Sequence, residues 1–144
     1  MSRYFEGVLQ LRPGRQDVLT FVRETTVQEG KAEIVKEAKV KGGIDLYFSS
    51  QRYLRALGQR LPGRFSGKLE MSRRLFSASG VTSKLIYRVT VLFRLLPFKR
   101  GDTVGLRGRE YRILAVKERV HLQDAATGVK EWRPLEEVDR AFGR

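Results

Sequence analysis

Cysteine is absent from the 144 residues of this chain, and histidine occurs once, at position 121. Without cysteine there can be no disulfide bond, zinc knuckle, iron–sulfur cluster or thiol nucleophile. One histidine cannot form a metal site by itself, so we expect no metal and no cofactor. A Gly-x-x-x-x-Gly-Lys-Ser/Thr phosphate loop is missing too. We therefore expect no catalytic residues and a protein that is not an enzyme.

Long apolar runs are also missing. No stretch approaches the roughly 18 apolar residues of a membrane span, and the first residues lack the apolar core of a secretion signal. We expect a cytoplasmic protein with no membrane partner and no small-molecule substrate. The 41% of apolar residues suffices for the core of one domain or of two very small ones.

Acidic residues are scarce relative to basic ones. The chain has 16 Asp and Glu against 29 Lys and Arg, which leaves a net charge of +13. Residues 51–100 carry twelve cations and one acid, whereas residues 1–50 and 101–144 are nearly neutral. An uncompensated excess repels itself, so it indicates an anionic partner. Its concentration in one third of the chain is typical of a phosphate-binding face.

Apolar periodicity predicts an α+β domain over residues 1–97. Strands are expected over 4–11, 32–40 and 44–48, and helices over 15–27 and 51–61. The second helix has Ser49 or Ser50 as its cap, and Pro62-Gly63 is expected to stop it. Two long strands follow, over 65–76 and 83–96, joined by a turn of small residues at 77–82.

The alternation within 83–96 is the clearest pattern in the chain. Its odd positions are apolar, and its even positions include cations. The strand over 65–76 alternates in a similar way. If the two strands pair as a hairpin, one surface should carry their cations and the other should face the core. The cations expected on that basic ribbon are Lys68, Arg74, Lys84, Arg88 and Arg94.

Residues 98–144 have a different sequence pattern. Short strands are expected over 103–106, 110–117, 120–124 and 130–133, followed by a turn of helix over 134–142. This rhythm, with Gly-Asp-Thr-Val at 101–104, resembles the SH3-like barrels common in translation and ribosomal proteins. The predicted fold class is therefore α+β, with an antiparallel sheet, two helices and a long basic β-hairpin, followed by a small SH3-like β-barrel.

Three aromatic or imidazole side chains could either pack or bind a partner. Trp132 is expected in the core of the barrel rather than stacked on a base. His121 alternates with Val120 and Leu122, which favours a partly buried strand residue over a general base. For Tyr53, stacking on a base and packing within the protein are equally expected.

The candidate RNA-binding residues are the cations of residues 51–100 together with Tyr53. The cations would neutralise backbone phosphates, and the start of the second helix could contact unpaired or stacked bases. The full set is Arg52, Tyr53, Arg55, Arg60, Arg64, Lys68, Arg73, Arg74, Lys84, Arg88, Arg94, Lys99 and Arg100.

Four sequence blocks resemble the Nmd-three family, the biogenesis and export adaptors of the large ribosomal subunit in eukaryotes and their archaeal relatives. The blocks are EGVLQLR at 6–12, GIDLYFSS at 43–50, RRLFS at 73–77 and KRGD at 99–102. Together they extend over almost the whole chain. Leu46 stands where the family motif usually has an aromatic residue.

The resemblance implies an α+β or OB-like unit followed by an SH3-like unit, similar to initiation factor five-A. It also implies binding to ribosomal RNA around the tRNA sites of the large subunit. Family members normally begin with a zinc-binding module of Cys-x-x-Cys pairs, which this chain lacks, so the resemblance is to a short, archaeal-type member. The lysine-tipped modification loop of factor five-A is missing, and that function is not carried over.

Two other interpretations stay open. The chain could be a resident archaeal large-subunit ribosomal protein, or a factor that blocks or guards the subunit. Alternatively, the last barrel could dock a protein while the basic middle serves as a non-specific RNA anchor. In each case the expected partners are ribosomal RNA and large-subunit proteins.

Overall fold

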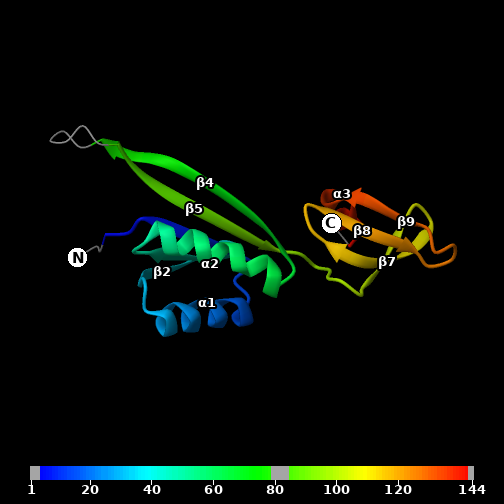
Figure 1. Cartoon of the computed structure of the whole chain (residues 1–144), viewed down its shortest axis with the longest axis horizontal. Helices are drawn as coiled ribbons and strands as arrows, with labels where there is room; N and C mark the ends of the chain where they lie inside the picture. Colours follow the sequence, from blue (N-terminus) through cyan, green and yellow to red (C-terminus); the bar gives the residue numbers. More distant parts are fainter. Residues whose placement is uncertain (1–3, 79–84, 143–144) are drawn as a thin grey trace. The chain divides into compact units, whose positions relative to one another are not determined.

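A computed structural model describes residues 4–78 and 85–142 (Figure 1). The chain divides into two compact units, Met1–Leu95 and Leu96–Arg144, each with its own buried core. The described residues form three helices and nine strands in two sheets. The predicted α+β class is therefore confirmed. No helix in the described ranges is long and apolar enough to cross a membrane.

The first unit contains one five-stranded sheet in the order β2-β3-β1-β5-β4. Neighbouring strands are antiparallel except β1 and β5, which are parallel, so the predicted antiparallel sheet is wrong at this pair. The two long predicted strands are present as β4 and β5 and pair along their length. The predicted turn falls mostly on residues 79–84, which lie outside the described residues. The strands are β1 (Gly7–Arg12), β2 (Ile34–Val40), β3 (Gly43–Phe48), β4 (Gly67–Ala78) and β5 (Leu85–Leu95).

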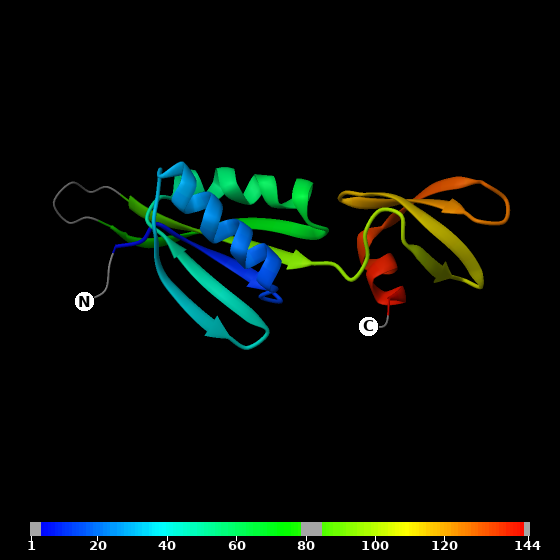
Figure 2. The ribbon, with the colours of Figure 1, turned by 90° about the horizontal axis from the view of Figure 1, so that it is seen from below.

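Two helices, α1 (Gln16–Glu29) and α2 (Gln51–Arg64), cover one face of this sheet (Figure 2). Their apolar faces and alternate strand residues form a single core, because side chains of a strand point to opposite faces in turn. Its fully buried members include Leu9, Leu46, Phe48, Leu54, Leu57, Val91 and Phe93. The face opposite the helices is not covered by any helix described within residues 4–95.

The ends of α2 follow local hydrogen bonding. The Ser50 hydroxyl accepts a bond from the Tyr53 amide at 3.2 Å, which confirms the predicted cap. The predicted stop at Pro62 is wrong, since the helix continues to Arg64. Pro62 stands in the last turn, where it removes only one helical bond, and the next turn is closed by the Phe65 amide donating to the Leu61 carbonyl at 2.8 Å.

The second unit is a meander of four antiparallel strands in the order β6-β7-β8-β9, followed by the helix α3 (Leu135–Ala141). The predicted short strands are confirmed to within about a residue. No pairing of β6 with β9 closes this sheet within the described residues, so the SH3-like barrel stays a prediction. The strands are β6 (Thr103–Leu106), β7 (Arg109–Val116), β8 (Arg119–Asp124) and β9 (Lys130–Pro134).

The core of the second unit does not include Trp132, so that prediction is wrong. The core consists of residues such as Phe98, Ile113, Leu122 and Val138, while Trp132 is 44% exposed. The alternation of β9 explains the difference. Arg133 lies on the side of α3, where its guanidinium donates to the Glu137 carboxylate at 2.6 and 2.7 Å. Its neighbour Trp132 must therefore point to the outer face.

Substitution of Gly43 tests the packing of β3 against β1. A Cβ at this position would lie 1.9 Å from the Leu11 carbonyl oxygen, a backbone atom that cannot move without disturbing the strand. We expect Gly43→Ala to lower the free energy of unfolding by about 2 to 3 kcal/mol, measured by urea denaturation.

The matched control is Gly63→Ala, because a Cβ there meets no atom within 4 Å. That helical position should tolerate alanine and gain up to about 1 kcal/mol. Equal stability of the two variants would contradict the proposed contact.

Candidate nucleic-acid interface

The sheet of the first unit has one face covered by helices and one face that we call the open face. The open face is formed by the strand positions that alternate with the core. In β4 and β5 the registers place Lys68 opposite Arg94 and Arg74 opposite Arg88 on this face. Four of the five cations expected on the basic ribbon therefore share one surface. The fifth, Lys84, lies outside the described residues.

Two of these cations are available to bind an anion. Arg74 and Arg94 are exposed and form no ion pair with any residue in the described ranges. Lys68 lies 3.6 Å from the Glu70 carboxylate. Arg12 on β1 lies beside Arg94 in register but is compensated, because it donates to Asp45 at 2.7 Å. The uncompensated charge of the open face therefore lies mainly on the β4 and β5 strands.

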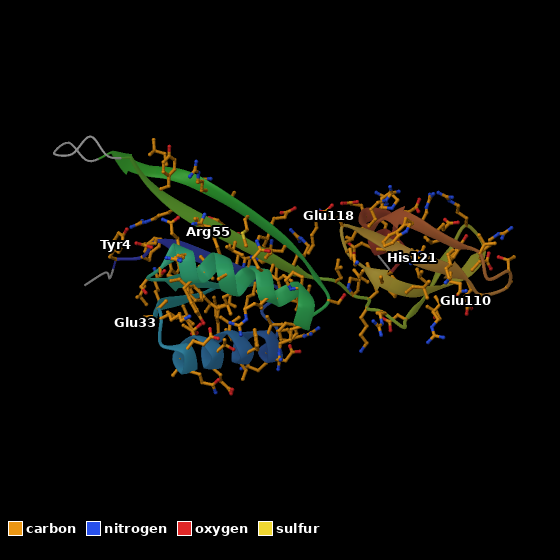
Figure 3. The ribbon with its side chains drawn as sticks, viewed as in Figure 1. Tyr4, Glu33, Arg55, Glu110, Glu118 and His121 are labelled. Atoms are coloured by element: carbon orange, nitrogen blue, oxygen red, sulfur yellow. The ribbon has the colours of Figure 1, made fainter. Side chains whose placement is uncertain are left out.

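A row of cations and aromatic rings crosses the open face near the start of β1. The Lys36 ammonium lies 5.1 Å from the centre of the Tyr47 ring, and the Phe5 ring meets Tyr47 edge-on at 4.8 Å. The Arg88 guanidinium lies 3.8 Å from the centre of the Phe5 ring and 5.8 Å from that of Tyr4. Tyr4, labelled ahead of β1 in Figure 3, is 59% exposed. We call these five residues the cation–aromatic row.

Most of the cation–aromatic row was missed from the sequence. The alternation within 43–48 does place Tyr47 on the face away from the core, which is a usable signal. The meeting of residues 5, 36, 47 and 88 depends on the strand order, and no local pattern gives that order.

Arg73 lies on the other side of the ribbon. It pairs in register with Val89, whose side chain is buried on the helix side. Its guanidinium lies 4.6 Å from the centre of the Tyr87 ring. The structure therefore separates Arg73 from its sequence neighbour Arg74 because adjacent strand residues point to opposite faces.

The cations of α2 lie on the helix side of the sheet, and Figure 3 labels Arg55 on that helix. Arg60 is paired with the Glu29 carboxylate at 3.0 Å, and Arg64 stacks over the Phe21 ring at 4.6 Å. Arg52 and Arg55 are exposed and form no ion pair with a described residue. The predicted binding set therefore does not form one surface. Lys99 and Arg100 belong to the second unit, just before β6.

Tyr53 is a packing residue, which decides the open question against base stacking. Only 8% of it is exposed, and its hydroxyl donates to the Glu29 carboxylate at 2.6 Å. Burial, followed by the hydrogen bond to Glu29, raises the pKa of Tyr53 to about 12. The same bond and the Arg60 guanidinium lower the pKa of Glu29. Tyr53, Glu29 and Arg60 thus tie α2 to α1.

The open face combines two kinds of side chain that can bind a partner. Exposed guanidinium groups bind phosphates, and rings with adjacent cations stack on bases. Within residues 4–78 and 85–142, no group of three or more acidic or histidine side chains is placed to hold a metal ion.

The chain was compared with models of known protein families. The family model described as "NMD3, second domain" matches residues 4–95 of the chain. These residues include both helices and all five strands of the first unit, and with them the open face. No curated protein matches the chain.

Replacement of Tyr53 tests the link between the two helices. The raised pKa means that the folded state holds the phenolic proton more tightly than the unfolded state. Its contribution to stability is therefore present below pH 10 and is lost as the pH rises to about 12. We expect the free energy of unfolding of Tyr53→Phe to be about 1.5 kcal/mol lower than that of the original chain at pH 7, measured by urea denaturation.

The same variant should lose the late-ionising phenol in an absorbance titration of tyrosine. Glu29→Gln, which removes the charge but keeps an acceptor, should shift that ionisation to lower pH. A titration that is identical in Tyr53→Phe and the original chain would contradict the assignment.

Proposed function

The chain belongs to the NMD3 family, which its motifs resemble, and on this basis we propose that it binds large-subunit ribosomal RNA as a non-enzymatic protein of the cytoplasm. The match to the family implies a ribosome-related role in general. Binding to RNA is our own inference from the surface of the first unit.

The observation that carries the proposal is the combination of charge and rings on the open face. Arg74 and Arg94 present exposed guanidinium groups, and the cation–aromatic row lies on the same face. Phosphates would supply most of the affinity through the cations, while the rings would contact unpaired bases. If about six cations reach phosphates, the affinity should fall as about the fourth to fifth power of the salt concentration.

The open face supports this role better than the face of α2. On the helix side Arg60 is neutralised by Glu29 and Tyr53 is buried, so the predicted stacking residue is lost there. The neighbouring helix α1 adds exposed acidic residues such as Asp17 and Glu24. We therefore assign the main contact to the β4 and β5 side of the open face, with Arg52 and Arg55 as a second, weaker one.

Two finer proposals come from the family. The second unit would complete an SH3-like barrel, and the chain would bind the subunit around its tRNA sites, transiently, as a biogenesis factor does. A resident ribosomal protein is the alternative. Its presence in both free large subunits and translating ribosomes would favour that alternative, whereas presence in free subunits alone would favour the transient role.

A pair of charge-reversed variants tests the open face. We expect Arg74→Glu with Arg94→Glu to release the chain from purified large subunits in co-sedimentation, because both cations lose their phosphates. The slope of log affinity against log salt should fall by about 1.5, since two phosphate contacts are removed.

The matched control is Arg52→Glu with Arg55→Glu, which changes the net charge by the same amount on the opposite side of the sheet. It should retain most of the binding. Equal loss in both double variants would indicate non-specific attraction, and full retention in the first would refute the open face as the interface.

A further inference from the structure

The second unit carries an exposed aromatic stack on the outer face of its sheet. Trp132 on β9 pairs in register with His121 on β8, which Figure 3 labels. Their rings are parallel to within 7°, with centroids 4.3 Å apart. His121 covers one face of the indole, and Trp132 is 44% exposed.

Cations surround this stack on the same outer face. Arg119 lies two residues from His121 on β8, and Lys130 lies two residues from Trp132 on β9. Arg112 on β7 is in the same row as Lys130, with Gln123 between them. All three cations are exposed and form no ion pair with a described residue. Glu110 is the carboxylate on this side of β7, two residues beyond Arg112, so the face stays positive.

The chemistry around Trp132 fits a nucleotide better than a protein. A protein-docking site buries a wide apolar patch, whereas the outer positions next to Trp132 are mainly charged or polar. A nucleotide needs one flat ring for its base and cations for its phosphate. The indole and its flanking Arg and Lys side chains supply both.

The hairpin that presents Trp132 is braced by Asp124 at the end of β8. The Asp124 carboxylate accepts from the Ala126 and Thr127 amides at 2.8 and 3.1 Å and from Arg109 at 2.9 Å. On the other side of β9, Arg133 is fixed by Glu137. The ring is thus held in place before a ligand arrives, which reduces the entropy lost on binding.

We propose that Trp132, backed by His121, stacks on an unpaired base of single-stranded RNA while Arg119 and Lys130 bind the adjacent phosphates. The proposal rests on the proposed function, since it requires that the chain bind RNA. It adds a base-binding site in the second unit, outside residues 4–95, to the open face of the first.

The test uses the intact chain, whose tryptophan fluorescence reports on this residue alone because the sequence contains one Trp. An unstructured adenine- and uridine-containing decamer should quench the emission, and the same decamer annealed to its complement should not. Trp132→Leu should weaken binding of the single strand about tenfold, measured by fluorescence anisotropy of a labelled decamer. The salt dependence should be unchanged, because no charge is removed.

Trp132→Phe is the conservative control and should keep most of the affinity, since it retains a flat ring. Arg119→Ala with Lys130→Ala should instead lower the salt slope. Retention of a folded sheet in each variant is checked by circular dichroism.

The outcomes separate this inference from the proposed function. Decamer binding without quenching, and with full affinity in Trp132→Leu, would overturn the stacking site and leave the open face intact. A different result would also overturn the site. If Trp132→Leu no longer captured large-subunit proteins after nuclease treatment but bound RNA with unchanged affinity, Trp132 would belong to a protein-docking surface. If the chain binds neither the decamer nor large subunits, the proposed function itself is contradicted, and the stacking site with it.

Discussion

The alternation of β5 is the constraint on which the first unit depends. Val89, Val91 and Phe93 point into the core beneath α1 and α2, so Arg88 and Arg94 must point the other way. Because the period of a strand is two residues, a slip of one residue would bury both guanidinium groups and expose the core residues. Burying an unpaired charge costs more free energy than a hydrophobic contact supplies. The core therefore fixes the position of the charges.

This constraint explains how the fold accommodates a net charge of +13. Some of the 29 cations are paired with an acid, as Arg12 is with Asp45 and Arg60 with Glu29. Another part lies over rings, where a cation gains about 0.5 to 1 kcal/mol at an exposed site. Others, such as Arg74 and Arg94 on the open face and Arg52 and Arg55 on the helix side, are exposed and form no ion pair with a described residue. The exposed cations that repel one another, because they have no acidic partner, are therefore the residues available to an anionic partner.

Local patterns predicted the elements well because they depend on nearest neighbours along the chain. The alternation of 83–96 and the Ser50 cap were sufficient to place β5 and the start of α2. Strand order was beyond reach, since the parallel pairing of β1 with β5 joins residues about 80 positions apart. This pairing brings Phe5 next to Arg88, so the cation–aromatic row could not be predicted although each of its members was visible in the sequence.

The place of two aromatic residues, the open one of Tyr53 and the wrongly predicted one of Trp132, depends on tertiary contacts. Tyr53 lies one residue from Leu54 on the buried stripe of α2, and its partner Glu29 is 24 residues away. Trp132 was assigned to the core because apolar residues usually fill a small sheet. The inner side of β9 is instead occupied by Arg133, which α3 neutralises through Glu137. Tyr53 is held by a hydrogen bond to a residue of another helix, and Trp132 points outward because its neighbour Arg133 pairs with α3, the helix that directly follows β9.

The consequence for binding is that flat rings beside cations occur in both units. Each set is small, and phosphate contacts alone would attract any RNA. Two weak sites on one chain gain affinity together only when a single RNA can occupy both at once. A structured RNA that can occupy both sites at once would meet this condition, whereas an RNA that reaches only one site would not. Selectivity for a structured RNA can therefore arise without any base-specific hydrogen bond.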